Sequence, residues 1–350
     1  MINNDYYSQQ VHGPYELYDI GNFELEEGGT IPDCKIAYNT LGTLNEAKDN
    51  AILVTAWYSG TTKIMEQIYV GDNHALDPNK YFIILINQIG GGLSSSPHNT
   101  PSPHGMTNFP NVRIGDDVRA QHKLITEKFG IEKLALIFGC SMGGQQIWEW
   151  AVRYPDMVQR AAPVAISAKN TEHAFIFAET LNEAIKSDSA WNGGNYKHSS
   201  DVRVGLFRQA RLWAVMGLSP AFYTQQYWRN MDFSSVEDFI TGFLETYYEP
   251  LDPNDLLCMA WKWQRGDVSR HTNGNLQEAL GRIKAKTFVI AFDGDMFVPS
   301  ETLRYEQGMV PNSEFRTVNT ICGHFALFAI EPEYITQIDK YVGELLAEPV

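Results

Sequence analysis

The sequence predicts a doubly wound α/β fold in which a helical segment interrupts a mostly parallel sheet. Short runs of apolar residues alternate with helix-like segments in the first half of the chain and again near its end. Several runs are continuous apolar blocks, which is the composition of strands buried on both faces of a parallel sheet. Alternation of such strands with helices is typical of a doubly wound sheet.

Six strands and three helices outside the interrupting segment follow from these patterns. The strands are predicted at residues 35–40, 51–57, 81–87, 134–139, 162–166 and 287–292. A helix at 118–129 would follow Asp116 and Asp117, whose carboxylates can cap its first turn. A helix at 145–154 would stop before Pro155, and a last helix is expected at 331–346.

The interrupting segment spans residues 170–283, lacks strong strand signals and is expected to be a helical lid. Residues 1–169 and 284–350 would then form the core. Five of the eight tryptophans lie in the segment: Trp191, Trp213, Trp228, Trp261 and Trp263. Such aromatic density would serve the segment's own small core, a substrate tunnel or a dimer contact.

Charge and composition narrow the classes of partner. The 350 residues include 42 acidic and 27 basic ones, a net charge of −15 that repels phosphate backbones and anionic membranes. We therefore expect neither nucleic acid nor membrane as a partner. The opening residues MINNDYYSQQ lack the basic and apolar regions of a secretory signal, so the cytoplasm is the expected location. The four cysteines have no CxxC spacing and are expected to be free thiols.

The strongest local signal is a Gly-Cys-Ser-Met-Gly motif at residues 139–143, between a predicted strand and a predicted helix. A serine at this sharp turn adopts strained backbone angles, and small residues two positions before and after it let the turn close. The turn exposes the hydroxyl of Ser141 and aims the following backbone N–H groups toward it. This context is that of the nucleophile in α/β hydrolases.

A serine nucleophile needs a base, and in α/β hydrolases the chain order is serine, then an acid after a late strand, then histidine in a late loop. His324 is the histidine that stands in the expected loop. Asp293 and Asp295 both follow the strand predicted at 287–292, and either would reach His324. The acid would orient the imidazole and stabilise the imidazolium.

An oxyanion hole for this chemistry needs two donors. The motif makes the Met142 N–H one of them, and the loop after the strand at 51–57 should supply the other, for which we choose the Tyr58 N–H. The glycine-rich run after residue 89 breaks the phosphate-binding pattern because Ser95 replaces its third glycine. His98 and His104 have no metal-ligand spacing, so we expect no metal and no bound cofactor.

With these residues placed, the chain resembles the homoserine O-acetyltransferase group of α/β hydrolases over nearly its whole length. The most specific similarity is Ser-Met-Gly-Gly-Gln-Gln at 141–146 with Glu-Trp-Ala-Val-Arg-Tyr-Pro at 149–155; residues 37–45, 87–96 and 117–121 are also similar. The late acid of the family lies in an Asp-x-x-x-Pro segment, which matches Asp295 and Pro299 and selects Asp295 as the acid. The resemblance implies that Ser141 takes an acyl group from a donor and passes it to an alcohol or to water.

Departures from the family change the expected acceptor. The oxyanion loop, usually His-Ala-Leu-Thr-Gly, contains Trp57 and Tyr58 here. The aspartate that receives the homoserine amino group is replaced by Phe325, and a lid tyrosine by Leu218. With Trp213 nearby, this pocket should accept apolar groups, because an ammonium buried beside Phe325 would cost several kcal/mol.

The lid arginine that holds the homoserine carboxylate is kept as Arg211, which either still binds a substrate carboxylate or pairs with a lid carboxylate.

We therefore expect an acyl-ester hydrolase or O-acyltransferase with a Ser-His-Asp triad, acting on small, fairly apolar esters and alcohols. The acyl donor, an ester or acetyl-CoA, would be a substrate and not a bound cofactor. Two alternatives stay open: a true homoserine O-acetyltransferase, and a non-catalytic binding module that keeps the fold. The resemblance also implies a homodimer formed through the lid.

Overall fold

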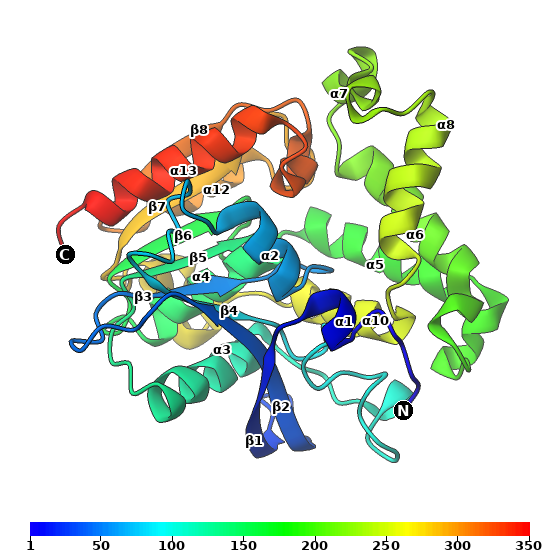
Figure 1. Cartoon of the computed structure of the whole chain (residues 1–350), viewed down its shortest axis with the longest axis horizontal. Helices are drawn as coiled ribbons and strands as arrows, with labels where there is room; N and C mark the ends of the chain where they lie inside the picture. Colours follow the sequence, from blue (N-terminus) through cyan, green and yellow to red (C-terminus); the bar gives the residue numbers. More distant parts are fainter.

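An eight-stranded sheet lies at the centre of the computed structural model, which describes residues 1–350 (Figure 1). The strands follow the order β1-β2-β4-β3-β5-β6-β7-β8. Their bounds are β1 Glu16–Glu24, β2 Thr30–Leu41, β3 Ala51–Thr55, β4 Phe82–Ile86, β5 Leu136–Cys140, β6 Arg160–Val164, β7 Lys286–Phe292 and β8 Ser313–Val318. The pairs from β4 through β8 are parallel, and β2 pairs antiparallel with both β1 and β4. The predicted mostly parallel α/β sheet is thus confirmed.

Each of the six predicted strands overlaps an observed one, and the two strands that the sequence did not reveal are the outer strands of the sheet. Central strands such as β3, β4 and β5 are buried at every residue, which produces the continuous apolar runs. β1 has one buried residue and β8 also has one, at its last position. Edge strands with little buried surface have no apolar run to detect.

Helices cover both faces of the sheet, with α2 in contact with α13 and α3 in contact with α4 (Figure 1). The α-helices are α1 Gln9–His12, α2 Thr62–Tyr69, α3 Ile114–Lys123, α4 Met142–Arg153, α5 Glu172–Lys186, α6 Arg203–Met216, α7 Pro220–Thr224, α8 Val236–Phe239, α9 Thr246–Tyr248, α10 Pro253–Gln264, α11 Leu276–Leu280, α12 Ser300–Gln307 and α13 Pro332–Ala347. The 3₁₀ and π segments are η1 Met106–Asn108, η2 Leu124–Lys128, η3 Ser189–Gly194, η4 Ser199–Val202, η5 Tyr227–Met231, η6 Ile240–Glu245, η7 Val268–Thr272 and η8 Gly323–Phe328. None of the helices has both the length and the apolar composition needed to cross a bilayer.

The helix predicted at 118–129 begins four residues earlier, at Ile114, and its last part, η2, is a π-helix. Asp116 does cap the helix, because its carboxylate accepts a hydrogen bond from the Arg113 N–H at 2.8 Å. The capping role predicted for Asp117 is wrong, since this side chain turns into the core and accepts from the Ile89 N–H at 2.8 Å.

The insertion between β6 and β7 contains the α-helices α5 to α11, of which α6, α7 and α8 stand to one side of the sheet (Figure 1). Within the insertion, α5 packs against α6 and α10, and α6 packs against η6. Trp213 on α6 and Trp263 on α10 are both buried. Their rings stack on each other with centroids 6.1 Å apart, so part of the tryptophan density builds the interior of the insertion.

A buried ion pair fastens the insertion to the core. The Lys262 Nζ of α10 donates to the Asp117 carboxylate at 2.5 Å and to the Ile89 carbonyl at 2.6 Å. Lys262 has no exposed surface and Asp117 has 1%. Burial raises the pKa of Asp117 to about 6, although the ammonium lies against it. A buried charge that loses its partner strongly destabilises a protein, so we expect substitution of either residue alone to lower the stability of the fold.

We expect Lys262→Met to lower the free energy of unfolding by about 3–5 kcal/mol, because it leaves the Asp117 carboxylate in the core without a cation. The double variant Asp117→Asn/Lys262→Met should lose much less, since it removes both charges and keeps an acceptor for the Ile89 N–H. Urea-induced unfolding of the three proteins measures this difference. Equal losses in the single and double variants would contradict the proposed cost of the lone carboxylate.

Candidate active site

Ser141 occupies a strained turn between β5 and α4. Its backbone angles are φ 52° and ψ −129°, a conformation that a residue with a side chain adopts only when its surroundings impose it. The Ser141 N–H donates to the Val164 carbonyl at 2.8 Å, and the Gln145 N–H donates to the Ser141 carbonyl at 3.2 Å. The turn is therefore held by β6 on one side and by the first turn of α4 on the other.

The glycines two positions before and after Ser141 leave no room for a side chain. A Cβ on Gly139 would lie 2.3 Å from Thr55 Oγ1 and 2.7 Å from the Gly143 carbonyl carbon. A Cβ on Gly143 would lie 2.5 Å from the Thr55 carbonyl oxygen. The motif thus keeps β5, the start of α4 and the end of β3 close enough together to form the turn.

Ser141, His324 and Asp295 form a continuous chain of hydrogen bonds. Ser141 Oγ lies 2.8 Å from His324 Nε2, and His324 Nδ1 lies 2.7 Å from Asp295 Oδ2. The other oxygen of Asp295 accepts from the N–H groups of Phe297 and Val298, both at 2.9 Å. Both oxygens of this carboxylate are therefore fixed in place. Asp293, the acid left open by chain order, is exposed.

The three side chains lie in an aromatic and largely dry environment. Exposure is 6% for Ser141, 2% for His324 and 6% for Asp295. The Phe297 ring meets the imidazole edge to face at 4.8 Å, and the Trp213 ring from α6 stacks on it at 6.2 Å. The rings exclude water from the imidazole, and hydrogen bonds between polar groups are stronger where water is excluded. The hydrogen bonds of His324 to Ser141 and Asp295 therefore hold the imidazole in a single orientation.

The loop after β3 lies against the serine turn. The Cβ position of Gly143 would come within 3.0 Å of the Ala56 carbonyl oxygen, and Gln88 Nε2 holds that oxygen at 2.8 Å. Tyr58 follows two residues later and is buried, with its hydroxyl 3.5 Å from Gln209 Oε1. Met142 is the first residue of α4, so its N–H lies in the first turn and has no partner within the helix. Both predicted oxyanion donors thus belong to segments adjoining Ser141.

Of the five predicted pocket residues, Trp213 packs on the imidazole and Phe325 follows His324 in the chain. The Phe325 ring stacks on Trp213 at 5.5 Å. Leu218 is buried next to Gly217, whose carbonyl accepts from the Phe325 N–H at 2.9 Å. Trp57 turns toward the insertion, where its Nε1 donates to the Tyr247 hydroxyl at 3.3 Å.

Arg211 has a carboxylate partner within the insertion. Its Nε and Nη2 lie 2.9 Å and 2.8 Å from Glu245 Oε1. Sequence reasoning missed Glu245, because 34 positions separate the two residues and no motif links them. It also missed Phe297, for which a signal existed, since this aromatic residue lies two positions after Asp295.

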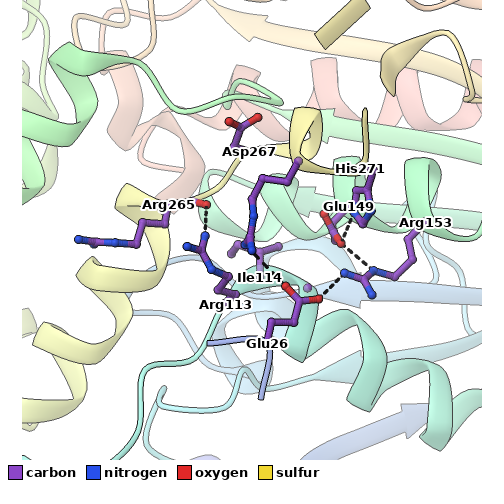
Figure 2. A pocket seen from close by; sticks show the side chains of 10 residues that line it. Glu26, Arg113, Ile114, Glu149, Arg153, Arg265, Asp267 and His271 are labelled. Carbon is purple, nitrogen blue, oxygen red and sulfur yellow. Dashed lines mark hydrogen bonds and ion pairs between the residues drawn. The ribbon is translucent and has the colours of Figure 1, made fainter. Parts of the chain in front are cut away.

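A separate polar hollow of about 350 Å³ lies where α3, α4 and the end of the insertion meet. Figure 2 shows that Glu149 lies between His271 and Arg153, which it contacts at 2.9 Å and 2.7 Å. Arg153 also pairs with Glu26. None of Ser141, His324 and Asp295 lines this hollow, and most of its charges are matched in pairs, so we assign it no catalytic role.

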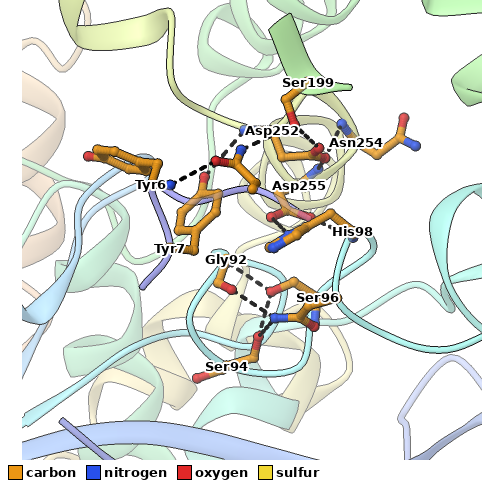
Figure 3. A network of polar contacts seen from close by, with 12 residues as sticks. Tyr6, Tyr7, Gly92, Ser94, Ser96, His98, Ser199, Asp252, Asn254 and Asp255 are labelled. Carbon is orange, nitrogen blue, oxygen red and sulfur yellow. Dashed lines mark hydrogen bonds and ion pairs between the residues drawn. The ribbon is translucent and has the colours of Figure 1, made fainter. Parts of the chain in front are cut away.

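One group of side chains has the spacing of metal ligands. The candidate ligand atoms of His98, Asp252 and Asp255 lie within 4.8 Å of one another. Figure 3 shows that they belong to a hydrogen-bonded network. Asp252 accepts from the hydroxyls of Tyr196 and Ser199, both at 2.7 Å, and Asp255 contacts His98 Nδ1 at 2.5 Å. Protein donors already occupy these oxygens, and the network ties the 87–100 loop to α10.

Several known proteins are similar to this chain in sequence and architecture. The family model of the alpha/beta hydrolase fold matches residues 70–329. The chain is 54% identical over 346 residues to an ethyl acetate hydrolase of Pseudomonas veronii, with 99% of each chain covered. It is 53% identical to the solved structure of an acetylester hydrolase from Corynebacterium glutamicum, with a TM-score of 0.98 and coverage of 99% and 100%.

More distant relatives are homoserine O-acetyltransferases, the alternative activity left open by the sequence. A homoserine O-acetyltransferase of Methanohalobium evestigatum is 37% identical over 362 residues, which cover 93% of this chain and 73% of the relative. The resemblance predicted from the sequence is confirmed, and the esterase relatives are more similar than this acetyltransferase. The serine turn, the eight-stranded sheet and these matches together establish that the chain belongs to the alpha/beta hydrolase family.

Proposed function

We propose that the chain is a serine-dependent esterase that cleaves small, fairly apolar esters through an acyl-Ser141 intermediate. The observation that carries the proposal is the unbroken hydrogen-bond chain from Ser141 through His324 to Asp295. The strained turn supports it, because backbone strain of this kind is concentrated at functional sites. The esterase relatives, similar over nearly the whole chain, support the reaction class.

In the proposed mechanism, His324 Nε2 takes the proton of Ser141 Oγ as the oxygen attacks the ester carbonyl. The N–H groups of Met142 and Tyr58 hold the oxyanion that forms, and one such donor typically contributes about 3 kcal/mol of transition-state stabilisation. His324 then gives the proton to the leaving alcohol. Asp295 keeps the imidazole in the correct tautomer and stabilises its charged form.

The acyl-enzyme is resolved when water or an alcohol attacks it, with His324 again as the base. Trp213 and Phe297 pack against the imidazole and Phe325 stacks on Trp213, and this apolar surface limits the access of water and favours apolar acceptors. No bound cofactor takes part in these steps, and the acyl donor is the ester substrate itself.

Homoserine is a poor match for this pocket. The residue after His324 is Phe325, which is 3% exposed and packed on Trp213, so the ammonium of homoserine would meet an aromatic ring and no carboxylate. Burying an unpaired ammonium costs several kcal/mol. The proposal therefore favours hydrolysis and transfer to simple alcohols over homoserine acetylation. Dimerisation through the insertion stays a prediction from the resemblance.

We expect Ser141→Ala to lower kcat for p-nitrophenyl acetate by about 10⁴-fold or more, because the nucleophile is lost. Asp295→Asn should lower it by about 10⁴-fold, since the imidazole loses its orienting carboxylate. Asp293→Asn is the matched control, two positions away and exposed, and should change kcat less than twofold. Steady-state release of nitrophenol measures all three, and equal effects at positions 293 and 295 would refute the assignment of the acid.

We expect added benzyl alcohol to divert acyl groups from water during turnover of p-nitrophenyl acetate, and added homoserine to divert almost none. The reason is the aromatic surface beside His324, which offers the homoserine ammonium no partner. Chromatography of the products at equal acceptor concentrations gives the partition ratios. More O-acetylhomoserine than benzyl acetate would contradict the apolar-acceptor proposal and favour the activity of the acetyltransferase relatives.

A further inference from the structure

An apolar groove of about 630 Å³ lies in the insertion between α6, α7 and the segment formed by α8 and η6. Its lining is mostly hydrophobic and includes Val215 of α6 and Leu218 of the turn that follows α6. Met296 contributes from the core. Arg211 is the one charged residue that lines it.

The groove adjoins both loops that carry the base and the acid. Met296 directly follows Asp295 in the chain. Leu218 directly follows Gly217, whose carbonyl is bonded to the N–H of Phe325, the residue after His324. A Cβ on Gly217 would come within 2.6 Å of the Phe325 ring, so the turn after α6 rests on the loop of the catalytic histidine. None of Ser141, His324 and Asp295 lines the groove itself, so it borders the site through these two loops.

Glu245 neutralises the charge of Arg211 at this groove. Two guanidinium nitrogens of Arg211 contact Glu245 Oε1, at 2.9 Å and 2.8 Å. The carboxylate side chain is 7% exposed, whereas the arginine side chain is 61% exposed. Glu245 forms no other ion pair, and Arg211 has no other carboxylate partner. Glu245 thus contacts Arg211 from the interior of the insertion. Without Glu245, the guanidinium of Arg211 would present its full positive charge to the groove.

We propose that Glu245 is a specificity-determining residue, which makes the enzyme prefer uncharged esters by occupying the guanidinium of Arg211. An unpaired arginine in an apolar groove would bind a substrate carboxylate through charge-assisted hydrogen bonds. With Glu245 in place, the Arg211–Glu245 pair has no net charge, so it attracts a substrate carboxylate only weakly. The negative charge of Glu245 also repels that carboxylate. Specificity of this kind is achieved by disfavouring the wrong ligand. The inference rests on the proposed esterase function and deepens it.

The test compares n-butyl acetate with 4-acetoxybutanoate, in which a carboxylate replaces the terminal methyl group of the alcohol part. The measured quantity is the ratio of kcat/KM for the anionic ester to kcat/KM for the neutral one, in which a general loss of catalysis cancels. We expect Glu245→Gln to raise this ratio at least about tenfold, mainly through a lower KM for the anionic ester, because Arg211 becomes free to bind it.

The matched control is Arg211→Gln/Glu245→Gln, which removes both charges and should return the ratio to within about threefold of the wild-type value. Arg211→Gln alone gives a second, independent test: it leaves the Glu245 carboxylate unpaired beside the groove and should lower the ratio below that of the wild type. Circular dichroism and the thermal midpoint check that each variant is folded.

An unchanged ratio in folded Glu245→Gln would overturn the proposal, as would an equal rise in the double variant. Failure of the esterase proposal would look different. In that case the wild type would not cleave n-butyl acetate, or Ser141→Ala would cleave it as fast as the wild type does.

Discussion

The backbone conformation of Ser141 is the constraint on which the rest of the structure depends. A positive φ of 52° at a residue with a side chain persists only because β3, β5 and β6 surround the turn. Thr55 at the end of β3 donates its hydroxyl to the Gly143 carbonyl at 2.9 Å and leaves no space for a side chain at Gly139 or Gly143. The sheet therefore imposes the turn, and the turn aims the hydroxyl at the loops that carry His324 and Asp295.

The insertion completes the site because buried polar contacts fix it to the core. Lys262 reaches Asp117 and the Ile89 carbonyl, and Asp255 holds both the backbone N–H and the ring of His98. All of these side chains are almost fully buried, so their hydrogen bonds have no competition from water. The contacts anchor α10, whose Trp263 stacks on Trp213, and Trp213 in turn covers the imidazole.

The sequence alone predicted the parts of the fold and site that are determined by neighbouring residues in the chain. Central strands leave continuous apolar runs and the serine turn leaves a motif, so six strands and the position of Ser141 were predictable. The edge strands β1 and β8 have too little buried surface to leave a run. Contacts between distant positions leave no trace in a single sequence. The pairing of Asp117 with Lys262 emerged from the three-dimensional structure alone. For Arg211, one expected alternative was a carboxylate of the insertion, and only the structure identifies it as Glu245. The lid boundaries and the oxyanion donors stay predictions.

The central claim is that Ser141 is the nucleophile, and covalent labelling tests it most directly. The native enzyme would be treated with a fluorophosphonate, digested and examined by mass spectrometry, while residual esterase activity is followed in the same samples. We expect one adduct per chain, located on Ser141, with activity lost in proportion to labelling. Labelling of another residue, or full activity in a protein completely modified at Ser141, would contradict it.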